Sequence, residues 1–141
     1  MTKDIYVHSL SVDKTAIDPN NHVSNIKYIE WMQDTAIAHS NELGFSYNRF
    51  KELGTVWIVK SHQIDYIRPI LLNDEIEITT WISKIVKSRF TREYSFARKT
   101  DKKILAKAQT DWIYFDIEKN RPCKQIHQEV LESFRIVEQK I

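Results

Sequence analysis

The sequence predicts an α+β domain in which one long buried helix packs against an antiparallel sheet. Residues 24–43 carry a wide apolar stripe at helical spacing, and four later segments have the composition of strands. Only short polar breaks separate those segments, which favours antiparallel hairpins because parallel neighbours need a longer crossover. The 141 residues suit a single domain, which we expect to span residues 1–141.

The first predicted elements are a strand, a turn and the long helix. Residues 4–12 alternate between apolar and polar side chains, as in a strand. The run Asp18-Pro19-Asn20-Asn21 has turn chemistry, since proline fixes φ and asparagine tolerates left-handed conformations. Ser24 is then the expected N-cap of the helix, and Gly44 follows its last turn. The buried stripe is predicted to contain Tyr28, Trp31, Met32, Thr35, Ala36, His39 and Leu43, broadened by Ile29 and Ile37.

The remaining chain supplies the sheet and a closing helix. Four segments rich in β-branched and aromatic residues are predicted as strands: 54–67, 74–86, 89–100 and 103–117. Together with the first strand they make a five-stranded antiparallel sheet. In the third of these segments one face carries Phe90, Arg92, Tyr94 and Phe96. The segment from Ile126 to Val137 has a helical apolar face and predicts a short C-terminal helix.

Composition narrows the classes of function. The 21 basic and 19 acidic residues nearly balance, which argues against nucleic-acid binding and is compatible with a small anionic ligand. Cys123 is the only cysteine, as expected in a reducing compartment, and no segment has the composition of a signal peptide or a membrane span. We therefore expect a cytoplasmic protein without a membrane partner. The histidines show no metal-ligand spacing, so no metal is expected.

The segment IDPNNHVSNIKYIEW, residues 17–31, carries the candidate chemistry. An acid, two amides and an imidazole lie within five positions, directly before the predicted helix. The start of a helix leaves backbone N–H groups unpaired and carries partial positive charge, so it can stabilise a carbonyl oxygen that gains negative charge. A carboxylate beside that point could attack the carbonyl carbon or activate a water. This layout suits acyl transfer.

The same segment resembles the active-site motif of the hot-dog-fold thioesterases. The Asp-Pro pair, Val23, Tyr28 and Trp31 are similar to the 4-hydroxybenzoyl-CoA thioesterase type. The segment also resembles the acyl-ACP thioesterase motif Asp-x-Asn-x-His-Val-Asn-Asn. That likeness rests on Asn20, His22, Val23, Asn25, Lys27, Tyr28 and Trp31. Further likeness lies in Tyr66-Ile67-Arg68-Pro69 before Asn73-Asp74, and in Arg121-Pro122. The predicted element order matches that fold over nearly the whole chain.

The resemblance implies hydrolysis of an acyl-CoA or acyl-ACP. Asp18 matches the catalytic carboxylate, as nucleophile or general base, with Asn20 and His22 as its polar partners. Asn25 matches the position whose backbone N–H polarises the thioester carbonyl. Tyr28 and Trp31 are expected to bind substrate, and Lys87 and Arg89 to meet the phosphates of coenzyme A. No cofactor is implied beyond coenzyme A or phosphopantetheine within the substrate. A homodimer with its sites at the interface, often a homotetramer, is also implied.

Departures from the motif and competing readings leave alternatives open. Ser24 stands where the acyl-ACP pattern has asparagine, and Asn73 stands where glycine is usual. Asp18 could also be a turn residue before proline, and His22 a satisfied polar residue. A hot-dog enoyl-thioester hydratase uses an Asp and a His, but His22 follows Asp18 by four residues where those enzymes have five. A non-catalytic acyl-thioester-binding module is a third reading.

Overall fold

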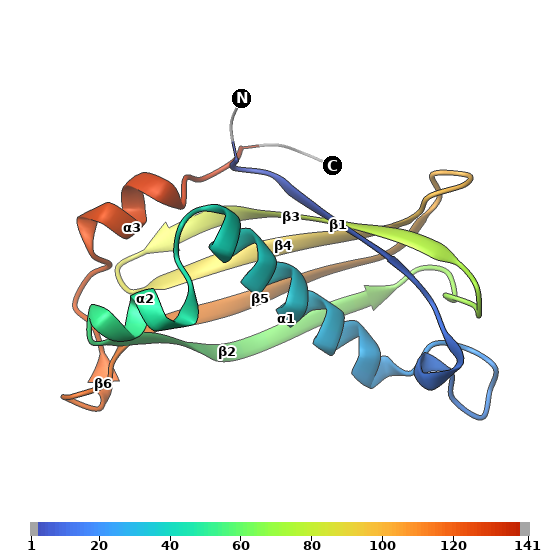
Figure 1. Cartoon of the computed structure of the whole chain (residues 1–141), viewed down its shortest axis with the longest axis horizontal. Helices are drawn as coiled ribbons and strands as arrows, with labels where there is room; N and C mark the ends of the chain where they lie inside the picture. The colour runs from blue at the N-terminus through green and yellow to red at the C-terminus, as the bar shows by residue number, and fades with distance from the viewer. Residues whose placement is uncertain (1–2, 139–141) are drawn as a thin grey trace.

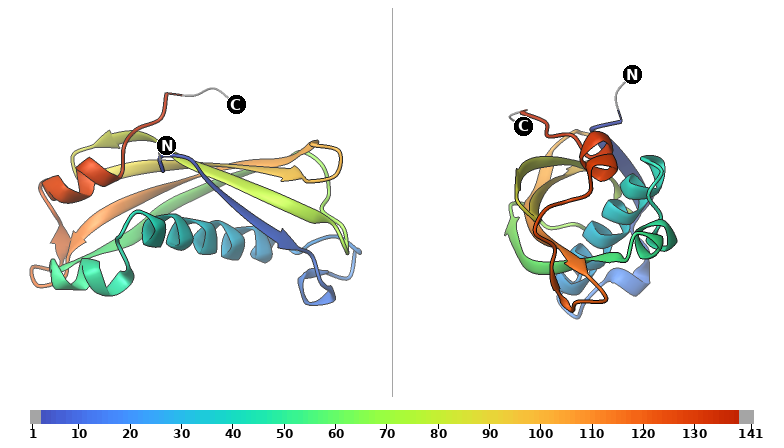
Figure 2. Two further views of the ribbon diagram at one scale, coloured as in Figure 1. Left: turned by 45° about the horizontal axis from the view of Figure 1, so that its top comes forward. Right: turned by 90° about the vertical axis from the view of Figure 1, so that its left-hand side faces the viewer.

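A computed structural model describes residues 3–138, and its central feature is one helix held inside a curled antiparallel sheet (Figures 1 and 2). The helix α1 spans Asn25–Glu42 and lies across the concave face of the sheet. The long strands are β1 (Tyr6–Ser11), β2 (Thr55–Tyr66), β3 (Glu75–Val86), β4 (Arg89–Arg98) and β5 (Ile104–Asp116). Each falls within a predicted segment, so the predicted α+β class with one long helix and five strands is confirmed.

The strands follow the order β1-β3-β4-β5-β2, and every neighbouring pair is antiparallel. Tight hairpins join β3 to β4 and β4 to β5, whereas the chain reaches β2 through α1. Therefore β1 and β2 form the two edges of the sheet. Of these, β2 is the longer, with 12 residues against six in β1. An unpaired edge of that length is an open template for another strand.

Capping and an apolar stripe account for α1. Ser24 has extended backbone angles, and its Oγ accepts the N–H of Ile26 at 3.3 Å. Gly44 follows the last turn with φ of +91°, the left-handed conformation that glycine adopts without strain. The stripe is buried at Tyr28, Met32, Thr35, Ala36 and His39, and half-buried at Trp31 and Leu43. These predictions are confirmed.

The predicted burial of one member of the stripe, Ile37, is wrong. Ile37 is 58% exposed, whereas its helical neighbour Ala36 is buried. The sheet covers only one side of α1, and Ile37 projects beside it. Periodicity alone could not show how wide a face the sheet would cover.

Replacing Ser24 by alanine is expected to lower the free energy of unfolding by about 1 kcal/mol, because the capping oxygen is lost. Urea unfolding at equilibrium measures this difference. Ser9→Ala is the control, since Ser9 is exposed on β1 and caps no helix; it should change the value by less than about 0.5 kcal/mol. Equal losses in the two variants would show that the Ser24 cap does not stabilise α1.

Several short elements differ from the predictions. The helix α2, Tyr47–Glu52, and the 3-10 turn η1, Lys14–Ala16, were not predicted. The two-residue strand β6, Arg121–Pro122, pairs with the end of β5. The closing helix α3 spans only Gln128–Ser133, because the chain beyond it becomes extended and Ile136 forms a parallel bridge with Ile82. The prediction of helix as far as Val137 is therefore wrong.

Two apolar clusters fill the space beneath the sheet, one toward each end of α1. Tyr28 and Met32 pack with residues of β3, β4 and β5 near the start of α1. Phe45, Phe50 and Phe134 pack with Phe90 and Tyr114 near its end, where α2 and α3 also lie. The loop between β1 and α1 therefore lies at one end of the molecule, and α2, α3 and β6 lie at the other (Figure 1). No helix within residues 3–138 is long and apolar enough to cross a membrane.

Candidate active site

The loop before α1 is a closed local structure. Ile17 and Val23 form an antiparallel bridge across it, and the N–H of Asp18 donates to the carbonyl of His22 at 2.8 Å. Asn21 turns the chain with φ of +65°, a conformation that asparagine tolerates better than most residues. The predicted turn is confirmed. Its tight closure brings residues 18–22 into one cluster.

The Asp18 carboxylate is held by the backbone of that cluster. Its Oδ1 accepts the N–H of Asn20 at 2.8 Å and the N–H of His22 at 3.2 Å. Asp18 is half-buried, whereas the side chains of Asn20 and His22 are exposed. The structure thus brings the three predicted residues together, with backbone amides in contact with the acid. A carboxylate fixed through Oδ1 keeps Oδ2 as its second basic oxygen.

The loop is attached directly to the tip of α1. The N–H of Ser24 donates to the carbonyl of Ala16 at 2.8 Å, beside the Ile17–Val23 bridge. Ser24 also takes two of the first helical N–H groups, that of Ile26 on its Oγ and that of Lys27 on its carbonyl. Asn25 is the first residue of α1, and its backbone N–H donates to no acceptor within residues 3–138. The helix therefore offers one backbone donor at its tip, where the partial positive charge is largest.

The aromatic residues predicted to bind substrate lie one turn further along. Tyr28 is buried, and its ring contacts Tyr66 edge-on with centroids 4.8 Å apart. Burial raises the pKa of Tyr28 to about 12. Trp31 is half-buried, with its ring centroid 6.4 Å from that of Tyr28. Both residues belong to the core cluster near the start of α1, and Tyr66 at the end of β2 joins that cluster to the sheet edge.

An exposed apolar rim surrounds the start of α1. The backbone of Val23 donates to the carbonyl of Ile70 at 2.9 Å, which ties the β2–β3 loop to the Asp18 loop. The rim consists of apolar or aromatic residues that are each between 41% and 68% exposed: Ile26, Tyr66, Ile67, Leu71 and Leu72. Exposed apolar side chains gathered in one place mark ligand or protein contact surfaces.

Lys87 and Arg89 lie far from this cluster within one chain. They flank the β3–β4 hairpin, whereas the Asp18 loop adjoins the start of β3, where Val12 donates to the carbonyl of Asp74. The 12 residues of β3 separate the two places by roughly 35 Å of strand. Contact between this hairpin and a thioester at Asp18 would therefore require a second copy of the chain.

Comparison with known proteins identifies the family. Residues 12–134 match the family model of the thioesterase-like superfamily. The chain belongs to this superfamily. Its sequence is 26% identical, over 136 residues, to FATB3, a chloroplastic acyl-[acyl-carrier-protein] hydrolase of Cuphea viscosissima, with 90% of this chain and 31% of that protein covered. A palmitoyl-acyl carrier protein thioesterase of Cuphea hookeriana is 24% identical, with 89% and 32% covered. The chain spans about a third of the length of these relatives.

Solved structures confirm the hot-dog fold of this thioesterase-like chain. An acyl-ACP thioesterase from Bacteroides thetaiotaomicron superposes with a TM-score of 0.87 at 16% identity, covering 99% of this chain and 57% of that one. A 1,4-dihydroxy-2-naphthoyl-CoA thioesterase from Synechocystis superposes with a TM-score of 0.84 at 14% identity, covering 92% and 95%. The predicted hot-dog fold is thus confirmed.

One departure from the family motif has a structural explanation. Asn73, which replaces the usual glycine, has φ of +70°, so this position requires the left-handed conformation. Asparagine is the side chain that most readily replaces glycine there. Asp74 completes the turn, because its Oδ2 accepts the N–H of Leu71 at 2.9 Å. The departure therefore leaves the turn intact.

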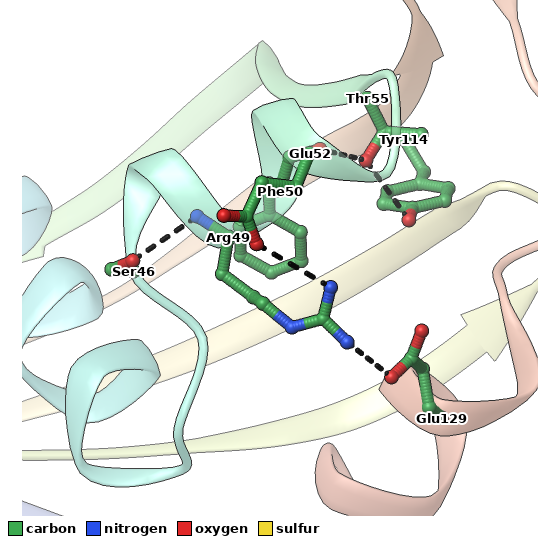
Figure 3. A network of polar contacts seen from close by, with 7 residues as sticks. All are labelled: Ser46, Arg49, Phe50, Glu52, Thr55, Tyr114 and Glu129. Atoms are coloured by element: carbon green, nitrogen blue, oxygen red, sulfur yellow. Dashed lines mark hydrogen bonds and ion pairs between the residues drawn. The ribbon is translucent and has the colours of Figure 1, made fainter.

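A cavity of about 320 Å³ lies at the other end of α1, away from Asp18. Ala36 and Ile37 of α1 line it, so it begins about 16 Å along the helix axis from Asn25. Across from them it is lined by Tyr47 and Phe50 of α2. Figure 3 shows how α2 is fastened there: Arg49 pairs with Glu129 of α3 at 2.6 Å, and Thr55 donates to the carbonyl of Phe50 at 3.1 Å.

Sequence reasoning missed one charged residue of this cavity. Arg92 lines it and is only 1% exposed. The sequence did contain a signal that Arg92 is buried, because strand alternation places it on the same face as Phe90, Tyr94 and Phe96. Within residues 3–138 no group of three His, Cys, Asp or Glu side chains could hold a metal ion. Burial raises the pKa of the Cys123 thiol, which disfavours its thiolate.

Proposed function

We propose that this chain is an acyl-thioester hydrolase acting on an acyl-CoA or acyl-ACP, with Asp18 as its catalytic carboxylate. Membership of the thioesterase-like superfamily supports the reaction class. The observation that carries the site is the fixed Asp18 carboxylate in a loop bonded directly to the tip of α1, where the N–H of Asn25 donates to no acceptor within residues 3–138. Asp18 either activates a water or attacks the carbonyl carbon to give a transient anhydride.

The proposed step places charge where the helix can stabilise it. As the nucleophile adds to the thioester carbon, the carbonyl oxygen gains negative charge and accepts the Asn25 N–H. Collapse of that intermediate breaks the carbon–sulfur bond and releases the free thiol. Asn20 and His22 hold the Asp18 carboxylate through their backbone N–H groups. Tyr28 and Trp31 flank the route of the acyl group, and no metal or redox cofactor takes part.

The assembly we propose is a homodimer joined along β2, with further pairing to a homotetramer. The edge strand β2 is 12 residues long and exposes Ile58 and Tyr66. Tyr66 contacts Tyr28, so a second copy paired along β2 would meet the apolar rim beside Asp18. The acyl chain would then lie between α1 and that second copy, and the partner's hairpin could bring its cations to the coenzyme A phosphates. We further propose that residues 1–141 form a single domain. We also propose that the protein acts in the cytoplasm, in fatty acid metabolism.

A panel of thioesters tests the function directly. We expect free thiol, followed with a thiol reagent, from one or more acyl-CoA esters ranging from acetyl to palmitoyl and including aryl members. The alternatives give different results. An enoyl-thioester hydratase would remove the enone absorbance of crotonyl-CoA without releasing thiol, and a binding module would hold the esters intact. Absence of thiol release across acyl-CoA and acyl-ACP substrates would refute the hydrolase.

A further inference from the structure

Arg92 is a buried cation that the proposed hydrolysis does not use. It lies on β4 beneath the second half of α1, and its Nη1 donates to His39 Nδ1 at 2.8 Å and to Thr80 Oγ1 at 3.2 Å. Its Nε is buried and bonds to no acceptor within residues 3–138. Part of the donor set of the guanidinium is therefore unsatisfied, which is rare for a buried polar group.

Within the part of the chain that the structure describes, no anionic side chain forms an ion pair with the charge of Arg92. Its nearest polar partner is His39, and burial together with the Arg92 charge lowers the pKa of His39 to about 4. At neutral pH His39 is therefore uncharged and accepts the bond at Nδ1, while its Nε2 donates to the carbonyl of Lys3 at 2.6 Å. A buried cation without a counter-ion is costly unless something else supplies the negative charge.

The surroundings of Arg92 have room for such a group. Arg92 lines the 320 Å³ cavity, a volume at the small end of ligand sites. Most of the remaining lining is apolar or aromatic, including Phe90, Val56 and Phe134. Two further buried donors that bond no acceptor within residues 3–138, Nε1 of Trp57 and Nε1 of Trp112, also belong to lining residues. The cavity reaches the surface between α1 and α2, where Ile37 and Tyr47 are exposed.

We propose that this cavity binds an organic carboxylate, with its carboxylate on the Arg92 guanidinium and its apolar body against the aromatic lining. A planar carboxylate matches the fork of a guanidinium and can take two of its N–H groups at once. One carboxylate also neutralises one cation. A phosphate would bring more negative charge than the single cation balances, and it lacks the planar pair of oxygens that fits the fork.

This site is separate from the proposed reaction centre within one chain. The carboxylate could belong to a free acid of medium length or to the far end of a thioester's acyl group, and both present the same chemistry to Arg92. The second source rests on the proposed hydrolase function, whereas binding of a free acid does not. Binding measurements on the full chain therefore test the cavity even when no thioester is turned over.

The first experiment compares octanoate with octanamide, its uncharged analogue of nearly equal shape. Titration calorimetry, with the fluorescence of the cavity tryptophans as a second readout, gives both affinities. We expect octanoate to bind about 10- to 100-fold more tightly, the effect of a charged hydrogen-bonded pair. Equal affinities, or no binding of either compound, would overturn the proposal.

Two variants locate the carboxylate. Arg92→Met removes the cation while keeping an unbranched apolar stem, and should abolish the preference for octanoate with octanamide binding nearly unchanged. Ala36→Leu narrows the cavity with Arg92 in place, and should weaken both compounds together. Ala36→Leu also keeps the test informative if Arg92→Met does not fold, as judged by near-ultraviolet circular dichroism. An octanoate preference that survives in folded Arg92→Met, or full octanoate affinity in Ala36→Leu, places the carboxylate elsewhere and refutes the site.

Thioesters then distinguish the two sources. Hexadecanedioyl-CoA, whose extended chain is long enough to cover the roughly 16 Å from the tip of α1 to the cavity, ends in a free carboxylate, and palmitoyl-CoA of equal length does not. If the acyl end occupies the cavity, Arg92→Met lowers kcat/KM for hexadecanedioyl-CoA at least about tenfold and leaves palmitoyl-CoA unchanged. If the ligand is a free acid, the variant treats both esters alike while losing octanoate binding. Either result requires the octanoate preference, so its absence remains the decisive contrary result.

Discussion

Replacing Asp18 by asparagine is expected to lower thioester hydrolysis by about 100- to 10,000-fold, the usual contribution of a positioned acid or base. The structure explains why the fold should survive. Asn retains an oxygen at the position that accepts the N–H groups of Asn20 and His22, so the loop keeps its bonds. Only the second oxygen, which would act on water or on the thioester carbon, becomes an amide nitrogen. Turnover with the best acyl-CoA substrate measures the effect.

Asp13→Asn is a matched control for that experiment. Asp13 lies five residues earlier and likewise accepts a backbone N–H two residues ahead, that of Thr15 at 2.9 Å. The same charge is lost, from a carboxylate that caps η1 and whose hydrogen bonds within residues 3–138 go to Thr15, with none to the Asp18 loop or to α1. Asp13→Asn should therefore keep near-normal turnover, and both variants should melt within a few degrees of the unmodified chain. Near-normal turnover in Asp18→Asn would remove Asp18 from the mechanism.

The parts of the fold that were predictable are those fixed by local pattern. The stripe on α1 follows from helical spacing, and Ser24 and Gly44 mark its ends because their side chains suit the two caps. The strands β3 and β4 follow from alternation and the short break at Lys87-Ser88. Each of these features depends on residues close together in the chain, so no knowledge of the packing was needed.

Features set by packing between distant segments were not predictable. The short helix α2 is held by Arg49 against Glu129, 80 residues away, and by its own N-cap Ser46 (Figure 3). The end of α3 was misplaced because Ile136 bridges to Ile82, a contact that periodicity does not contain. Propensity is only a weak guide to such short elements, since tertiary contacts decide them.

The candidate site likewise has parts that the local sequence predicts and parts that depend on packing between distant segments. Asp18, Asn20 and His22 come together because they are neighbours in one loop, which the turn residues alone indicate, and Asn25 follows at the first position of α1. The separation of Lys87 and Arg89 from that loop depends on the length of β3 and on the path of the sheet. The pairing of Arg92 with His39 joins positions 53 residues apart, so alternation could mark Arg92 as inward without naming its partner.

His39 should make the stability of the fold depend strongly on pH. It is 1% exposed on α1 and stacks on Tyr6 of β1, with ring centroids 5.5 Å apart. Burial is the largest cause that lowers its pKa from 6.5 to about 4, and the charge of Arg92 lowers it further. The carbonyl of Lys3 and the carboxylates of Asp4 and Glu42 oppose that change with weaker effects. Between pH 6.5 and about 4, His39 is therefore protonated in the unfolded chain but neutral in the folded chain.

The sign of the pH effect follows from that difference. Between pH 6.5 and about 4 the unfolded state binds more protons, so the free energy of unfolding falls as the pH falls; below about 4 His39 adds no further loss. At about 1.36 kcal/mol for each pH unit between the two pKa values, the total loss is roughly 3 kcal/mol. His39→Gln is the comparison, because glutamine can accept from Arg92 and donate to Lys3 without titrating. Urea unfolding from pH 7 to pH 4 should show a steeper decline for the unmodified chain than for His39→Gln. Parallel declines would contradict this prediction. They would mean that His39 becomes protonated in the folded chain, beside the charge of Arg92, as readily as in the unfolded chain.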